Sequence, residues 1–115
     1  MKKKYRLLKN QDFKEVLDNH RCVSRENLKI FYKSNQLEHC RVGVSVSSKI
    51  GNAVVRHKIK RQVTSMLDKC LNISESIDIV VIVKNRYLDF TYNQNYEIVE
   101  KNVNEILKRS KINEK

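Results

Sequence analysis

Apolar residues recur along the chain with two spacings, one typical of helices and one typical of strands. Where they are three or four positions apart, they predict amphipathic helices over residues 10–19, 52–71 and 94–109. Where they alternate strictly with polar residues, they predict strands over residues 28–33 and 41–47. In the first of these strands the even positions form an apolar face. In the second, valines alternate with Gly and Ser.

A third pattern is a run of β-branched residues. The sequence DIVVIV at 78–83 predicts a strand buried on both faces. Residues 21–25 are a candidate for a short extra strand, and the polar stretch 34–40 is typical of a turn. The order of helices and strands predicts an α+β fold: one small domain with helices packed on a mixed four-stranded sheet.

Few residues interrupt these elements. Asn10 or Asp12 can cap the first helix, and Asn52, directly after Gly51, can cap the second. The 115 residues include two glycines and no proline, and neither a Gly/Ser-rich linker nor an internal repeat divides them. We therefore expect a flexible basic arm over residues 1–9, a single domain over 10–110 and a flexible tail over 111–115.

Composition excludes some classes of protein. Hydrophobic residues make up 40% and charged residues 32% of the chain, and no segment approaches the roughly 18 apolar residues of a membrane-spanning helix. The basic start is not followed by the apolar segment of a signal peptide. The three cysteines, Cys22, Cys40 and Cys70, are odd in number and widely spaced, which favours free thiols in a reducing cytoplasm.

The net charge of +11 is concentrated in one part of the chain. Residues 1–67 hold 16 Lys and Arg against 5 Asp and Glu, whereas residues 68–115 hold 8 of each. A field concentrated in this way favours a polyanionic partner. The alternative, a merely solubilising surface or arm, stays open at this point.

The second predicted helix carries most of this argument. On a helical wheel its apolar positions gather on one side, and the opposite side presents cations with no acidic residue between Lys49 and Arg61. Like charges spaced in this way repel one another, and an opposing polyanion would relieve the repulsion. The candidate phosphate-binding residues here are Lys49, Asn52, Arg56, His57, Lys58, Lys60 and Arg61.

These residues also carry a family resemblance. The run KIGNAVVRHKIKR at 49–61 resembles the signature of the bacterial ribonuclease P protein component. Further matching motifs follow in family order over about residues 5–107: a basic arm, the Asp12-Phe13 helix, RVGVSV at 41–46 and DIVVI at 78–82. The chain departs from the family where an Arg-Asn-Arg triplet becomes Arg56-His57-Lys58 and where an aromatic residue becomes Leu17.

The resemblance implies a fold and two RNA surfaces. The implied fold is a ribosomal-protein-type α+β domain with a left-handed βαβ crossover. The basic helix and the loop before it would contact the catalytic RNA subunit, and a cleft between the first helix and the sheet would bind the 5′ leader of precursor tRNA.

Residues of the first helix and of the two alternating strands could form this cleft. On the strand at 28–33 an aromatic residue stands between two lysines, a pattern suited to a stacked base between phosphates. The candidate leader-binding residues are Phe13, Leu17, Lys29, Phe31, Lys33 and Ser45. For the three apolar residues among them, an ordinary place in the core is the alternative.

No arrangement of side chains in the sequence suggests catalysis or a bound cofactor. The three histidines and three cysteines lack the spacing of a metal site, and a two-histidine ribonuclease would need His20 and His57 to meet. The resemblance implies that the RNA subunit cleaves with bound Mg²⁺, while the protein positions precursor tRNA. Two alternatives remain: a ribosomal or general RNA-binding protein, and a DNA-binding helix without a recognisable helix-turn-helix partner. We expect neither a membrane nor DNA as partner.

Overall fold

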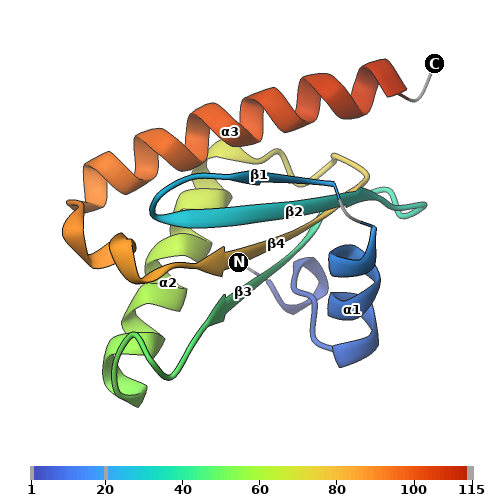
Figure 1. The fold of residues 1–115 in the computed structure, drawn as a ribbon. Coiled ribbons are helices and arrows are strands. Elements are labelled where there is room, and N and C mark those ends of the chain that lie inside the picture. The colour runs from blue at the N-terminus through green and yellow to red at the C-terminus, as the bar shows by residue number, and fades with distance from the viewer. Residues whose placement is uncertain (1, 20, 114–115) are drawn as a thin grey trace.

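The computed structural model describes residues 2–19 and 21–113. They form three layers, with one mixed sheet between helices on its two faces (Figure 1). The elements in chain order are η1 (Lys3–Tyr5), α1 (Asn10–Asp18), β1 (Cys22–Ser24), β2 (Leu28–Ser34), β3 (Arg41–Val46), α2 (Ala53–Cys70), β4 (Ile77–Val83), η2 (Asn85–Asp89) and α3 (Tyr92–Asn113).

The four strands lie in the order β1-β2-β4-β3. The β1–β2 and β2–β4 pairs are antiparallel, and the β3–β4 pair is parallel. Parallel neighbours need a crossover connection, which α2 supplies between β3 and β4. The left-handedness of this crossover stays a prediction.

The two faces of the sheet are covered unequally. On one face α2 and α3 pack against the even-numbered residues of β2 and β3, and this is the main core. On the other face α1 packs together with Leu7 of the N-terminal segment, in a small cluster of Val16, Leu7 and Val80. Because β4 lies between both layers, nearly all of its residues are buried, as its β-branched run predicted. Much of the α1-side face is left without a covering helix (Figure 1).

The predicted helices and strands are confirmed, and the candidate strand at 21–25 is β1. Asn52 caps α2 as predicted, since its side chain accepts a hydrogen bond from Val55 N at 3.0 Å. The cap predicted for α1 is wrong: Lys9 occupies the N-cap position without a side-chain bond. Asp12 lies within the first turn, and its carboxylate contacts Arg41 instead. The two short 3₁₀ helices were not predicted.

The ends of the chain also differ from expectation. Residues 5–7 of the predicted flexible arm are docked on β3: Arg6 forms a parallel bridge with Val42, and Leu7 is buried. The sequence does not predict this contact, because the single buried side chain of Leu7 produces no periodic pattern. At the other end, α3 continues to Asn113 through the predicted tail, and residues 114 and 115 lie outside the described residues. None of the described helices is long and apolar enough to cross a membrane.

Candidate nucleic-acid interface

The orientation of α2 follows from its apolar side. Ile59, Val63 and Met66 are buried against the sheet and α3. This packing turns the opposite side of the helix to solvent, where His57, Lys58, Lys60 and Arg61 are all exposed. The helical wheel drawn from the sequence is therefore confirmed. The structure places Lys49 and Asn52, also exposed, in the turn that leads into the same end of the helix.

The cations of this surface lack acidic partners within the fold. In the part of the chain that the structure describes, no ion pair joins an Asp or Glu to any of the five basic residues. These are Lys49, Arg56, Lys58, Lys60 and Arg61. Arg56 is half-buried, and its Nε is shielded from solvent without a hydrogen-bond partner. An unpaired buried donor beside several exposed cations leaves an electrostatic cost that an anion can offset.

The α1-side face of the sheet presents its side chains in cross-strand rows. The register of β2, β4 and β3 defines three such rows. They are Lys29–Ile82–Ser45, Phe31–Val80–Gly43 and Lys33–Asp78–Arg41. Each row joins a predicted leader-binding residue of β2 to residues of β4 and β3, and Ser45 shares a row with Lys29.

Contacts from α1 cover two of these rows. The Phe13 ring lies so close over Gly43 that an added Cβ there would be 2.4 Å from Phe13 Cζ. Glu15 lies 4.0 Å from Lys33 Nζ, so this lysine has an acidic neighbour. In the row of Lys29, Ile82 packs against the small apolar cluster that includes Val16 of α1, but no ion pair joins Lys29 to an acid among the described residues. Lys29 Nζ instead lies 5.0 Å from the centroid of the Phe31 ring, a cation–π distance.

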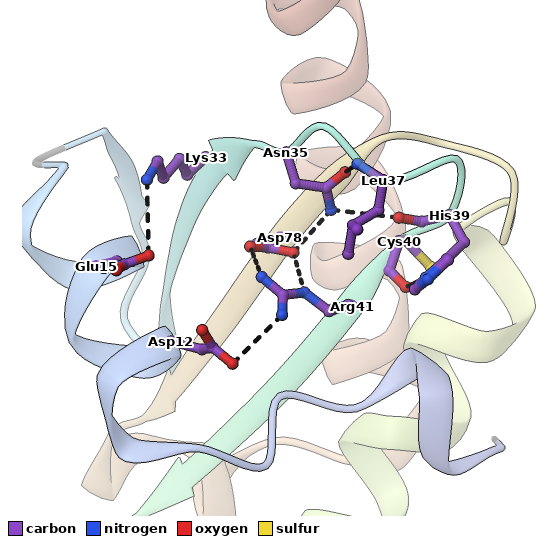
Figure 2. A network of polar contacts seen from close by, with 9 residues as sticks. All are labelled: Asp12, Glu15, Lys33, Asn35, Leu37, His39, Cys40, Arg41 and Asp78. Atoms are coloured by element: carbon purple, nitrogen blue, oxygen red, sulfur yellow. Dashed lines mark hydrogen bonds and ion pairs between the residues drawn. The ribbon is translucent and has the colours of Figure 1, made fainter.

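Arg41 joins three elements at the far end of this face, as Figure 2 shows. Its guanidinium donates to both carboxylate oxygens of Asp78, at 2.9 and 2.7 Å, and to Asp12 at 3.3 Å. Asp78 is almost fully buried and also accepts a hydrogen bond from Asn35 at 2.8 Å. The hydrogen bonds to Asp78 raise the pKa of Arg41 above its ordinary value. Arg41 is therefore a structural cation whose charge is matched inside the fold.

A groove of 570 Å³ connects the two predicted surfaces. It lies between the N-terminal segment, β3 and α2. Its lining includes Phe13 from the leader-binding set and His57, Lys60 and Arg61 from the catalytic-RNA-binding set. The remaining leader-binding candidates lie outside it: Leu17, Phe31, Lys29, Lys33 and Ser45.

The half-buried state of the apolar candidates answers one question left open by the sequence. Phe13, Leu17 and Phe31 all pack against the smaller apolar cluster, yet each keeps part of its surface exposed. Each of the three side chains is thus partly in the core and partly on the surface. Their contact with RNA stays a prediction. The cleft expected between α1 and the sheet is partly closed, because Phe13 rests directly on Gly43.

Some residues of the site were predicted only in part or not at all. Arg6, expected only as part of a basic arm, lines the groove together with Thr64, Ser65 and the acid Asp68. Lys84, beyond the end of β4, donates to Ser24 Oγ at 2.7 Å, near the row of Lys29. Of these, only Arg6 carried a signal in the sequence, since it lies in a basic arm. The others depend on contacts between distant segments.

The cysteines and acids of the described residues form no metal-like arrangement. No group of three or more His, Cys, Asp or Glu side chains among residues 2–19 and 21–113 is placed to hold a metal ion. Cys40 is buried, Cys22 and Cys70 are half-buried, and all three are free. Burial raises the pKa of Cys70 to about 11, which keeps its thiol protonated at neutral pH. His20 lies outside the described residues.

The fold and this interface define a class: a small α+β protein that presents an unmatched basic helix and a half-open sheet face to solvent, as expected of a nucleic-acid-binding protein. The family comparison then identifies the group within that class. The family model described as Ribonuclease P matches residues 1–111. This chain belongs to the ribonuclease P protein family.

Relatives named ribonuclease P protein component support the same assignment. The one from Clostridium novyi is 37% identical, with 96% of each chain covered. The one from Streptococcus agalactiae is 36% identical, with 94% of this chain and 95% of the relative covered. This chain therefore belongs neither to a ribosomal protein family nor to a family of DNA-binding helix modules, the two alternatives left open by the sequence.

Solved structures agree with the sequence comparison. The ribonuclease P protein of Staphylococcus aureus has a TM-score of 0.75 and 31% identity, covering 93% of this chain and 95% of its own. That of Thermotoga maritima has a TM-score of 0.70 and 25% identity, covering 90% and 96%. The chain is thus the protein component of ribonuclease P, a tRNA-processing endoribonuclease in which the RNA partner is catalytic.

Proposed function

We propose that this protein binds the catalytic RNA of ribonuclease P through α2 and the turn before it, and the 5′ leader of precursor tRNA through the α1-side face of the sheet. The first surface consists of Lys49, Asn52, Arg56, His57, Lys58, Lys60 and Arg61. The second consists of Phe13, Leu17, Lys29, Phe31, Lys33 and Ser45. In this proposal the enzyme works in the cytoplasm, and duplex DNA is not a ligand.

The observation that carries the proposal is the unmatched charge of α2. Arg41 shows what the fold does with a cation that serves stability: it surrounds the guanidinium with two carboxylates. Lys58, Lys60 and Arg61 receive no such partner among the described residues, although the helix is fixed in place by its buried apolar side chains. A rigid row of unmatched cations suits the phosphates of a folded RNA.

The sheet face suits a flexible single strand. Phe31 offers a ring on which any base can stack, worth about 1–3 kcal/mol per base, and Lys29 can then reach a phosphate. Because Lys29 Nζ lies over the same ring without RNA, the lysine has to swing aside when a base stacks. Ser45 completes the row with a small polar side chain, which allows close approach of the sugar–phosphate backbone.

The role of the protein in the reaction is positioning and charge compensation. Two polyanions, the catalytic RNA and the substrate, repel each other where they meet. A cationic protein between them reduces this repulsion, so the Mg²⁺ ions that activate water on the RNA subunit are needed at lower concentration. We expect the protein to hold no cofactor of its own.

The first test is cleavage of precursor tRNA at low Mg²⁺ concentration. The RNA subunit is assayed alone and with the protein, with a leader-bearing substrate. We expect clear acceleration by the protein, and more at low than at high Mg²⁺. Cleavage no faster than with RNA alone would overturn the proposal.

The second test separates the two surfaces. Arg61→Ala should lower the affinity for the catalytic RNA. Phe31→Ala should lower the affinity of the assembled holoenzyme for the leader-bearing substrate. Arg109→Ala is the matched control, because Arg109 is a partly exposed arginine of α3 that pairs with Glu105. Equal losses of both ligands in Arg61→Ala and Phe31→Ala would refute the assignment of two surfaces.

Salt dependence and competition test the electrostatic part. If about five phosphates of a single strand are neutralised, the log–log slope of affinity against salt should be roughly −3 to −4. A flat response contradicts phosphate binding. Duplex DNA should compete poorly with precursor tRNA, and efficient competition would restore DNA as a partner.

A further inference from the structure

A second basic groove lies on the opposite flank of the N-terminal segment. Its volume is 570 Å³, and it separates that segment from the loop between β2 and β3. Side chains of both signs and of apolar character line it: Lys4, Arg6, Leu8, Lys9, Leu37 and His39, with Asp12 and Arg41 alongside. Neither proposed RNA surface includes any of these residues, although Arg6 and Leu8 also line the first groove.

One wall of the groove is held in place by the docked N-terminal segment. Leu7 N donates to Val42 O at 2.8 Å, and the Leu7 side chain is buried. Tyr5 of this segment packs edge to face on His39 of the β2–β3 loop, with ring centroids 5.4 Å apart. The cations at positions 4, 6 and 9 therefore stand on a fixed backbone.

The other wall is held by Asn35. Its side chain accepts from Leu37 N at 3.0 Å and donates to His39 O at 3.2 Å and to Asp78 at 2.8 Å (Figure 2). The loop that carries Leu37 and His39 is thus tied to the same buried carboxylate that holds Arg41. Both walls are preformed, which lowers the entropic cost of binding a ligand between them.

The groove carries a net positive charge. Lys4, Arg6, Lys9 and Arg41 line it, and two carboxylates, those of Asp12 and the neighbouring Asp78, both contact Arg41. Lys4, Arg6 and Lys9 form no ion pair with any acid among residues 2–19 and 21–113. Lys9 is also the N-cap of α1 and supplies no side-chain acceptor, and the acid near this positive end of the helix dipole is Asp12 in the first turn.

Two exposed leucines give the groove a second chemical character. Leu8 is 58% exposed and Leu37 is 38% exposed, and they stand on the two walls. Leucine side chains cannot stack as aromatic rings do, but beside fixed cations they can make apolar contact with bases whose phosphates the cations bind. A simple anion would use the cations and leave the leucines in water, whereas a nucleic acid strand uses both.

We propose that this groove binds a single-stranded segment of RNA, with phosphates on Arg6 and Lys9 and a base against Leu8 and Leu37. The inference deepens the proposed function, on which it rests, by adding a third RNA contact. Two strands have the required chemistry: the distal part of a long leader and an unpaired segment of the catalytic RNA. The experiment distinguishes them.

The test compares Arg6→Gln/Lys9→Gln with the control Lys101→Gln/Lys108→Gln, which removes two exposed cations from α3. Affinity for the catalytic RNA is measured with free protein. Affinity for precursor tRNA is measured on assembled holoenzyme, with leaders of about three and about fifteen nucleotides. Thermal unfolding of each variant confirms that it is folded.

The outcomes are distinct. Each lost phosphate contact should reduce affinity about fivefold at 0.1 M salt, and the salt slope should fall by about 0.7. Loss only with the long leader assigns the groove to the substrate, and an equal loss of catalytic-RNA affinity assigns it to the RNA subunit. Affinities within twofold of the control for all ligands would overturn the inference.

A further pair of variants keeps this result separate from the proposed function. Leu8→Ser/Leu37→Ser removes the two apolar side chains without changing the charge of the groove. It should lower the affinity for the same RNA without altering the salt slope of binding. Arg61→Ala, in α2, reports the proposed function independently. If Arg61→Ala weakens RNA binding while both groove variants bind like the control, only the inference fails.

Discussion

Gly43 is the position where one added carbon atom should be felt most. A Cβ built on it would lie 2.4 Å from Phe13 Cζ and 2.7 Å from Cε1, whereas ordinary contacts begin at 3.4 Å. The ring must therefore move by about 1 Å, although Val16 of the same helix is fully buried and holds α1 in place. Overpacking of this kind costs about 1–3 kcal/mol, so Gly43→Ala should destabilise the protein by that amount.

A double-mutant cycle tests this reasoning. In the Phe13→Ala background the added Cβ meets no ring, so Gly43→Ala should cost less than about 0.5 kcal/mol. Urea unfolding of the four proteins, followed by circular dichroism, gives the coupling free energy. Ser45→Ala, on the same strand and face, is the control and should change stability by less than about 0.5 kcal/mol. An equal cost of Gly43→Ala in both backgrounds would show that the ring is not the cause.

Three further predictions concern other parts of the fold. Asp78→Ala leaves Arg41 half-buried with only Asp12 as partner and should cost about 3–5 kcal/mol in urea unfolding; a cost under 1 kcal/mol contradicts it. Asn52→Ala removes the N-cap bond of α2 and should cost about 1 kcal/mol, whereas an unchanged midpoint would show the cap to be unimportant. Cys70, with its pKa near 11 instead of 9.0, should be alkylated at pH 8 about a hundredfold more slowly than in urea, as peptide mass spectrometry can measure.

Local patterns in the sequence were enough to predict every regular helix and strand of the described chain. Each depends on neighbours within a few residues: the alternation of β2 and β3, the β-branched run of β4 and the amphipathic spacing of α2. The exposed side of α2 followed for the same reason, since helical geometry alone places Arg61 opposite Ile59 and Val63.

What escaped prediction depends on contacts between distant segments. The Arg41–Asp78 pair joins residues 37 positions apart, and it forms only because β3 and β4 pair in parallel with one register. The docking of Leu7 on β3 leaves no periodic trace. The capping error at α1 has the same origin, because Asp12 contacts Arg41 instead of its own helix end.

The placement of the N-terminal segment has a consequence for solubility. β3 is an edge strand, and an open edge can recruit a strand from another molecule. Arg6 and Leu7 occupy the hydrogen-bonding side of Val42 and so block part of that edge. Through this contact, residues 6 and 7 also protect the edge of the sheet against pairing with a strand of another molecule.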